Sequence, residues 1–200
     1  TGLADALLMA GLRYGSQEAA EWTRDVLRRV ARAAYLASAE LAREKGPFPL
    51  FDRDAFLVSD MMRRMDGEVR EAVAAHGLRN ALLTSIAPTG TISLVAGNVS
   101  SGIEPVFAQA YTRKVLLPDG TRREDEVVDY AVALWRRTRG DAPLPGWAVT
   151  AQDLDPLDHV RMQAAAQEWV DSSISKTINV PADLPFDRFR EVYREAYRQG

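Results

Sequence analysis

The chain has 200 residues, 46% of them apolar, and its 25 basic and 28 acidic side chains give a formal net charge of −3. This length and composition predict one folded domain with a sizeable core, and the well-mixed charges exclude a basic face for nucleic acid or an anionic membrane. The chain contains neither an apolar run approaching about 18 residues nor a signal-peptide pattern, so we expect a soluble, cytoplasmic protein. Because cysteine is absent, disulfides, thiolate metal sites and thiol chemistry by this chain itself are excluded, and we expect no metal site.

The first third of the chain predicts helices. A stripe of leucines near the start predicts a helix that stops before Gly15. Apolar residues at three- and four-residue steps predict one long amphipathic helix over residues 17–45, ended by a Gly-Pro pair. Two shorter helices are expected at residues 54–65 and 68–76, and Gly77 would close the second.

One apolar run breaks into a proline, a glycine and a cluster of hydroxyls. The short, partly β-branched segment Ala81–Ile86 predicts a buried strand, which Pro88 would end because proline cannot donate to a sheet ladder. Gly90 allows a turn, and residues 91–96 are long enough for a short helix ended by Gly97. The free N–H groups and partial positive charge at such a helix start favour a phosphate. Corners of this kind are common and most bind nothing, so the pattern alone favours a purely structural corner.

The middle of the chain predicts a polar loop, an extended segment and a helix. The loop carries Glu104 between an isoleucine and a proline, and a single glutamate of this kind is usually a cap or a solvated side chain. Residues 110–117 are expected to be extended and to end in a turn at residues 118–120. An amphipathic helix is predicted over residues 124–138, before a Pro/Gly-rich connector over residues 140–146.

Asp155 and Pro156 open a further helix, which we expect to run to about Val170. Two interpretations exist for Asp158 and His159 in its first turn. They could form an acid/base or metal pair. The capping rules favour the other interpretation, in which Asp158 completes the cap and His159 is a surface or packing residue.

The last part of the chain predicts a strand and a helix. Residues 172–181 alternate hydroxyl or amide side chains with apolar ones and end at a proline, which is typical of a strand with one wet face. Lys176 in this segment could reach a phosphate, although a lone strand lysine is usually solvated. Aromatic and aliphatic residues at helical spacing then predict a final helix that ends at Gly200.

Three separated motifs carry a family resemblance. They are Ala87–Ser93 (APTGTIS), Ser101–Phe107 (SGIEPVF) and Asp171–Asn179 (DSSISKTIN), and they are supported by Gly2–Leu7, Tyr111–Arg113 and His159–Ala165. In this order, over nearly the whole chain, these motifs resemble the C-terminal part of the ribonucleotide reductase catalytic subunit. The resemblance is closest to the adenosylcobalamin-dependent, class II branch.

This resemblance implies an α/β fold, in which residues 1–200 would be a single segment, the helix-rich second half of a ten-stranded α/β barrel. It also implies a site, because the corresponding loop of the family holds the substrate's phosphates through backbone N–H groups and hydroxyls. The residues that match this loop are Pro88, Thr89, Gly90, Thr91, Ile92 and Ser93. In the family, adenosylcobalamin yields a radical that passes to a cysteine, and the resulting thiyl takes the 3′ hydrogen of the ribose.

The sequence departs from the family in its catalytic residues. The finger motif Asn-x-Cys-x-Glu is absent, and so is every redox cysteine. We therefore expect a fragment that has no catalytic residue and no assignable cobalamin contact, and that is inactive when isolated. Glu104 does not replace the missing base, because it matches a different motif.

Three functions follow as hypotheses. The chain is a segment of a reductase that converts ribonucleotides to deoxyribonucleotides by radical chemistry, a catalytically inactive module that binds nucleotide phosphate, or a half-barrel assembly module. Expected partners are a ribonucleotide substrate and either the remainder of the reductase chain or a second half-barrel. A homo-oligomer is a further option, because open strand edges and apolar surface favour association. Neither nucleic acid nor a membrane is an expected partner.

Overall fold

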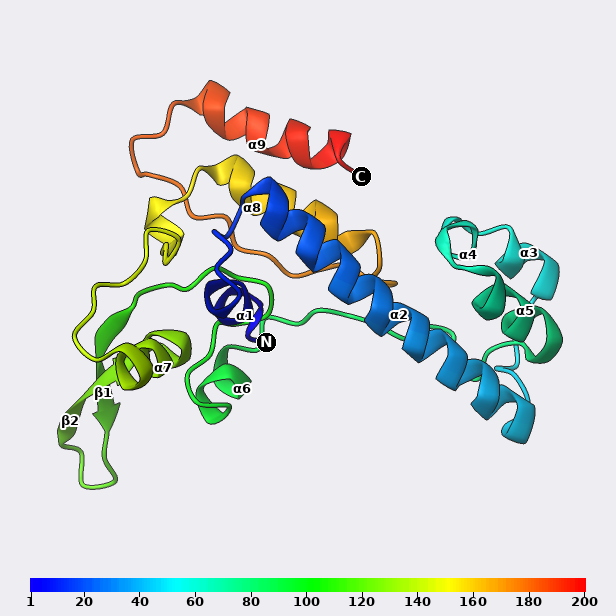
Figure 1. Ribbon diagram of the computed structural model, residues 1–200, viewed down its shortest axis with the longest axis horizontal. Coiled ribbons are helices and arrows are strands. Elements are labelled where there is room, and N and C mark those ends of the chain that lie inside the picture. The colour runs from blue at the N-terminus through cyan, green and yellow to red at the C-terminus, as the bar shows by residue number, and fades with distance from the viewer. The chain divides into compact units, whose positions relative to one another are not determined.

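The computed structural model describes all 200 residues, which form two compact units (Figure 1). Unit 1 contains residues 1–20, 87–163 and 175–200, and unit 2 contains residues 21–86 and 164–174. The helices are α1 (Leu3–Met9), α2 (Gln17–Lys45), α3 (Arg53–Leu57), α4 (Asp60–Arg64), α5 (Gly67–His76), α6 (Gly90–Val95), α7 (Tyr130–Arg139), α8 (Pro156–Gln167) and α9 (Phe186–Arg198), with one 3-10 turn at Ala151–Asp153. The strands are β1 (Ala110–Leu116) and β2 (Arg122–Val128).

The core of unit 2 forms along α2. Because apolar residues recur every three or four positions on this 29-residue helix, Ala31, Tyr35 and Ala39 lie on one buried face. Side chains from α4, from α5, from the residues directly after each of them and from the segment that follows α8 complete the cluster: Met62, Met65, Val69, Val73, Leu78 and Trp169. The long helix predicted over residues 17–45 is confirmed with the same bounds.

Capping side chains begin the short helices of unit 2. Asp52, Ser59 and Asp66 each accept a hydrogen bond from the backbone N–H three residues further on, and they begin α3, α4 and α5. The single helix predicted over residues 54–65 is therefore wrong. The cap at Ser59 divides it into two helices of five residues each.

The helix predicted over residues 68–76 is confirmed as α5, and it ends at Gly77 as expected. The φ of Gly77 is +74°, a conformation that side chains rarely adopt. A Cβ at this position would also lie 2.9 Å from Cβ of Pro47 and 3.0 Å from Cε1 of Phe51. Only glycine therefore allows the chain to turn this closely over Pro47 and Phe51.

Asp171 ties together two segments of unit 2. Its Oδ2 accepts hydrogen bonds from the N–H groups of Leu83 (2.7 Å) and Thr84 (3.1 Å), and its Oδ1 accepts one from the hydroxyl of Tyr35 (2.5 Å). Thr84 accepts two hydrogen bonds in return. Its Oγ1 accepts one from the N–H of Asp171, and its carbonyl accepts one from the N–H of Ser172. One carboxylate thus replaces the start of a strand ladder.

The buried strand predicted over Ala81–Ile86 is wrong, and so is the strand predicted over residues 172–181. The two segments meet in one isolated parallel bridge, between Ile86 and Ile174. The Asp171 carboxylate occupies N–H groups that a ladder would use, and Leu82 is 66% exposed. A ladder needs regular backbone partners, and here side chains supply most of them.

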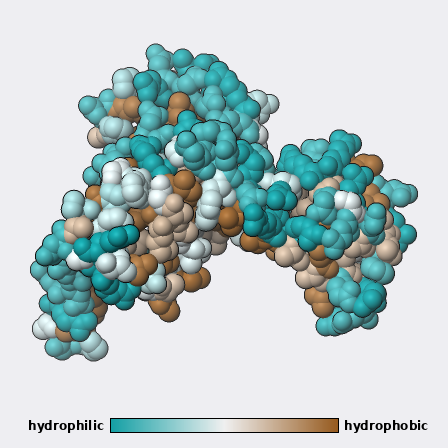
Figure 2. Space-filling view, viewed as in Figure 1, coloured by the Kyte–Doolittle hydropathy of each residue, from teal (hydrophilic) through white to brown (hydrophobic).

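The β-hairpin of unit 1 confirms the extended segment and the turn that the sequence predicts. β1 and β2 are antiparallel, with Ala110 opposite Val128 and Leu116 opposite Arg122. Gly120, with a φ of +83°, closes the turn by donating its N–H to the carbonyl of Leu117. Hydrophilic residues cover this hairpin, at the lower left of the space-filling view (Figure 2).

The helix predicted over residues 124–138 is correct only in its second half. Residues 124–128 belong to β2 because they pair with β1, and α7 begins at Tyr130. Asp129 caps α7 by accepting from the N–H groups of Ala131 and Val132, and these two residues are buried where α7 contacts α1. The structure is therefore helix-rich with a single two-stranded hairpin.

The C-terminal helices agree with the sequence in type. α8 ends at Gln167, three residues earlier than expected, and α9 covers Phe186–Arg198. The aromatic stripe of α9 is exposed: Phe186 by 71%, Tyr193 by 66% and Tyr197 by 89%. None of the helices combines the length and the apolar character needed to cross a membrane.

Replacing Asp171 tests whether its carboxylate holds unit 2 together. Asp171→Ala leaves two backbone donors and the Tyr35 hydroxyl without their acceptor, so we expect the free energy of unfolding to fall by about 2–3 kcal/mol. Tyr35→Phe removes one of these bonds and should cost about 1 kcal/mol. Urea denaturation followed by circular dichroism measures both, with Asp183→Ala in an exposed turn as the control. Equal losses for Asp171→Ala and Tyr35→Phe would contradict this account.

Candidate functional site

The corner at the start of α6 has free backbone donors. The first backbone hydrogen bond of the helix runs from the N–H of Ser93 to the carbonyl of Thr89 (2.8 Å). The N–H groups of Gly90, Thr91 and Ile92 lie before it and donate to no acceptor in the chain, and all three residues are exposed. The short helix predicted over residues 91–96 is thus confirmed, although it begins and ends one residue earlier than expected.

The hydroxyls of this corner mostly hold its shape. Thr89 has a φ of +52°, unusual for a residue with a side chain, and its Oγ1 accepts from the N–H of Gly102 (2.7 Å). Ser93 is buried, donates to the carbonyl of Gly90 (2.9 Å) and lies 3.1 Å from Oγ of Ser101. Among the predicted hydroxyls only that of Thr91 is exposed and makes no hydrogen bond within the chain.

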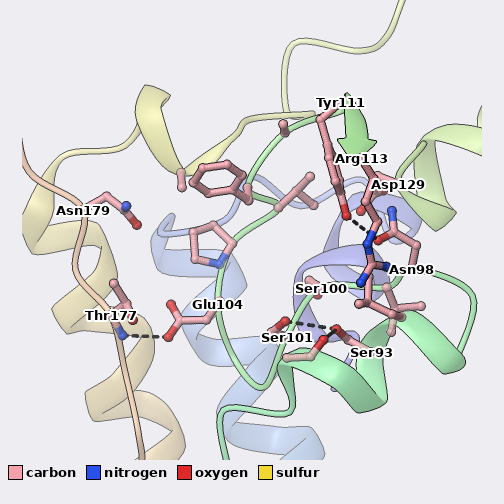
Figure 3. Close-up of a pocket in the computed structure, with 18 residues that line it drawn as sticks. Ser93, Asn98, Ser100, Ser101, Glu104, Tyr111, Arg113, Asp129, Thr177 and Asn179 are labelled. Carbon is pink, nitrogen blue, oxygen red and sulfur yellow. Dashed lines mark hydrogen bonds between the residues drawn. The ribbon is translucent and has the colours of Figure 1, made fainter. Parts of the chain in front are cut away.

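A cleft of about 490 Å³ opens beside the corner, within unit 1 (Figure 3). Gly90 and Ser93 line it, whereas the other four predicted loop residues do not. Polar side chains face it from several segments, and its apolar wall includes Val106 and Phe107. Its size and its mixture of an apolar wall with a few polar groups are typical of small-molecule sites.

Three ionisable side chains meet at one edge of the cleft. Nζ of Lys176 bonds to Oε2 of Glu104, lies 2.9 Å from Nδ1 of His159 and donates to the carbonyl of Thr177 (2.6 Å). The other oxygen of Glu104, Oε1, accepts from the N–H of Thr177 at 2.7 Å. Burial lowers the pKa of Lys176, and the hydrogen bond and charge of Glu104 oppose this shift.

Both of the sequence-based interpretations of this pair are wrong. The side chain of Lys176 is only 1% exposed, so it is neither solvated nor free to reach a phosphate. Glu104 is 21% exposed and is held by Lys176 and Thr177, so it is neither a cap nor a solvated side chain. No local sequence pattern indicates this ion pair, because 72 residues separate the two partners.

His159 is fully buried, and the packing interpretation is correct for it. Burial and then the charge of Lys176 lower its pKa to about 4, so the ring is neutral at pH 7 and its Nδ1 accepts from Lys176. Its Nε2 is buried and has no hydrogen-bond partner. The nearby backbone of Ala151 acts in the opposite direction to burial and raises the pKa of the ring. Asp158 pairs instead with Arg13 (3.2 Å) and Arg161 (2.8 Å), so it forms no acid/base pair with His159.

Two buried carboxylates lie under the opposite side of the cleft. Asp5 accepts from the N–H groups of Ser100 (2.7 Å) and Ala131 (3.2 Å), and Oδ1 of Asp129 accepts from those of Ala131 (3.0 Å) and Val132 (3.2 Å). Burial and then the charge of Asp5 raise the pKa of Asp129 to about 6, against the effect of its two backbone bonds. Sequence reasoning missed both residues. An acid inside the apolar stripe of α1 and an acid directly before the apolar face of α7 were the available signals.

The chain matches a known protein family over almost its whole length. The family model described as ribonucleotide reductase, barrel domain, matches residues 1–137 and 146–200. The chain belongs to the ribonucleotide reductase barrel-domain family. The resemblance carried by the three sequence motifs is therefore confirmed.

The curated relatives of this reductase domain include B12-dependent enzymes. A vitamin B12-dependent ribonucleoside-diphosphate reductase of Mycobacterium tuberculosis is 36% identical over 98% of this chain and 28% of its own length. A protein of the same name from Thermoplasma acidophilum is 34% identical over 98% of this chain and 26% of its own length. A vitamin B12-dependent ribonucleotide reductase of Streptomyces coelicolor is 27% identical over 98% of this chain. The chain thus spans about a quarter of the length of these relatives.

Variants of Asp129 test the buried carboxylates. Asp129→Asn keeps the capping oxygen and removes a charge that burial and Asp5 disfavour, so we expect it to match or exceed the wild type in stability at pH 7.5. Asp129→Ala also removes the cap and should lower the free energy of unfolding by about 1 kcal/mol.

The stability difference between Asp129→Asn and the wild type should depend on pH. Because the folded-state pKa of Asp129 is raised from 3.8 to about 6, its favourable contribution is complete below pH 3.8 and is lost as the pH rises through 6. The stability of Asp129→Asn relative to the wild type should therefore increase between pH 4 and pH 7, as measured by thermal unfolding. A difference that does not change with pH would contradict the assignment.

Proposed function

We propose that this chain is the part of a ribonucleotide reductase that binds the phosphate groups of the substrate, at Pro88, Thr89, Gly90, Thr91, Ile92 and Ser93. One observation carries this proposal. The N–H groups of Gly90, Thr91 and Ile92 are exposed and have no acceptor in the chain. Together with the partial positive charge of the helix start, such donors suit a phosphate oxygen.

The electrostatics of the corner support the same proposal. The first turn of α6 contains no acidic residue, and the exposed hydroxyl of Thr91 can add a side-chain bond. Arg113 lines the adjoining cleft and makes no ion pair, so it adds positive charge there (Figure 3). The bond from Gly102 to Thr89 keeps the corner in shape before a ligand arrives.

The whole protein would convert ribonucleotides to deoxyribonucleotides by radical chemistry. Relatives that bear the reductase name at 34–36% identity support this activity, and residues 1–200 would form the helix-rich second half of a ten-stranded α/β barrel. The reactive residues would lie outside this chain, since it contains no cysteine to carry the radical or to reduce the ribose. The cytoplasmic location expected from the sequence belongs to the same proposal.

Adenosylcobalamin would be the cofactor of the whole protein, where it supplies the initiating radical. The residues of this chain do not fit it. The cleft of about 490 Å³ suits a drug-sized ligand and is too small for a cobalamin, and the chain has no cysteine to receive the radical. We therefore assign no step through the cofactor to these residues.

The exposed face of α9 favours assembly as a second role. Phe186, Tyr193 and Tyr197 are each more than 60% exposed on one side of this helix. A row of exposed aromatic side chains is typical of a contact surface. The remainder of the reductase chain or a second half-barrel would cover this surface. If the chain is instead a catalytically inactive module, it would keep the same surface and the phosphate corner.

Gly90→Val tests the phosphate corner without disturbing the fold. A Cβ at Gly90 meets no atom within 4 Å, so the added side chain should be tolerated while it covers the free donors. We expect pyrophosphate to bind at least tenfold more weakly to this variant and a few-fold more weakly to Thr91→Val, as measured by isothermal titration calorimetry. Gly67→Val, at the same helical position of α5 and equally free of close neighbours, is the matched control. Unchanged binding by Gly90→Val would make the corner purely structural.

The isolated chain should be catalytically inactive. With a ribonucleoside diphosphate, adenosylcobalamin and a dithiol, we expect no deoxyribonucleotide, because no thiyl radical can form on a chain without cysteine. Chromatographic analysis of the reaction mixture measures the product. Any turnover would refute the division of labour proposed here.

A further inference from the structure

We infer that Glu104 accepts a hydrogen bond from a ribose hydroxyl of a nucleotide bound in the cleft, and that Lys176 is the positioning residue that holds Glu104 for this contact. The inference rests on the proposed function, because it places the nucleoside next to a phosphate bound at Gly90. It adds a residue that the phosphate corner does not require.

The cleft connects the two sites. Gly90 and Ser93 line it on the side of the phosphate corner, and Glu104 and Thr177 line it at the edge that holds Lys176. In the close-up, the carboxylate of Glu104 points toward Thr177, and Ser101 lies between Glu104 and Ser93 of α6 (Figure 3). A ligand that fills the volume of about 490 Å³ can therefore touch both.

Glu104 retains unused acceptor capacity. A carboxylate offers about four lone-pair positions, and the two hydrogen bonds to Glu104 come from Nζ of Lys176 and the N–H of Thr177. The side chain is 21% exposed, so a ligand can approach it. A hydroxyl donor from the cleft is the group that this geometry accepts.

Lys176 neutralises the charge of Glu104, so that an anionic ligand can bind in the cleft. An unpaired carboxylate beside the cleft would repel a phosphate, whereas the buried ammonium group compensates its charge. Lys176 itself has three donors and three acceptors, namely Glu104, His159 and the carbonyl of Thr177, and its side chain is only 1% exposed. It therefore holds the carboxylate in place and leaves the ligand to contact Glu104.

Calorimetry with three ligands separates the hydroxyl contact from the phosphate contact. On the unmodified chain, cytidine diphosphate should bind about tenfold or more tightly than its 2′,3′-dideoxy analogue, as expected for a hydrogen bond to a charged group. Pyrophosphate, which has no ribose, reports on the corner alone. This comparison requires no variant to fold.

Variants then assign the contact to Glu104. Glu104→Gln leaves only a neutral amide oxygen as acceptor, so it should reduce the preference for cytidine diphosphate over the dideoxy analogue several-fold and leave pyrophosphate binding unchanged or slightly tighter. Lys176→Met should also reduce this preference and weaken pyrophosphate binding several-fold, because the charge of Glu104 is then uncompensated. Pyrophosphate binding should recover in the double variant Glu104→Gln/Lys176→Met, which a loss of packing alone would not allow. The control is Glu124→Gln, which removes the exposed ion pair with Lys114 on the hairpin.

The outcomes are distinguishable. Equal affinities of the unmodified chain for cytidine diphosphate and the dideoxy analogue, or a preference that is undiminished in Glu104→Gln, would overturn the inference while the phosphate corner stands. If pyrophosphate fails to bind the unmodified chain, the phosphate proposal fails and this inference fails with it.

Discussion

A buried ammonium group joins the segments that surround the cleft. Nζ of Lys176 bonds to Glu104, donates to the carbonyl of Thr177 and lies against Nδ1 of His159, so each of its donors has an acceptor. Burying a charge is costly unless it is paired and hydrogen-bonded, and here both conditions hold. The loop after α6, helix α8 and the segment of residues 175–179 are thereby fixed to one another.

The same loop is held at its other end by the start of α1. The carbonyl of Ser100 accepts a hydrogen bond from the N–H of Gly2 (2.7 Å), and its Oγ accepts one from the N–H of Ala4 (3.1 Å). The N–H of Ser100 donates to Asp5. Asp5 also bonds to Ala131 at the start of α7. Clamped at Ser100 and at Glu104, the loop between them has little freedom, and it forms the floor and wall of the cleft.

Elements that depend on near neighbours in the sequence were predictable, and elements that depend on distant ones were not. Helix α2 and the glycine that ends α5 follow from local spacing and from backbone conformation. The strand expected before Pro88 failed because a carboxylate 87 residues further along the chain takes the N–H of Thr84. Val127 and Val128 continue the apolar spacing of the helix that follows, yet pairing with β1 overrides this pattern.

The candidate site divides in the same way. A proline, a glycine and hydroxyls in succession were sufficient to locate the corner, and the three motifs were sufficient to identify the family. The contact between Glu104 and Lys176 joins residues 72 positions apart, and each looked like a solvated side chain by itself. A buried ion pair leaves no local pattern, because each partner is explained only by the other.

The central claim is that a phosphate group binds the free N–H groups at the start of α6. Titration of the 15N-labelled chain with pyrophosphate, followed by amide chemical shifts, tests it most directly. We expect the amides of Gly90, Thr91 and Ile92 to shift and to saturate together, whereas those at the start of α5, where the carboxylate of Asp66 already caps the helix, stay in place. Unmoved amides at residues 90–92, or equal shifts at both helix starts, would contradict the account.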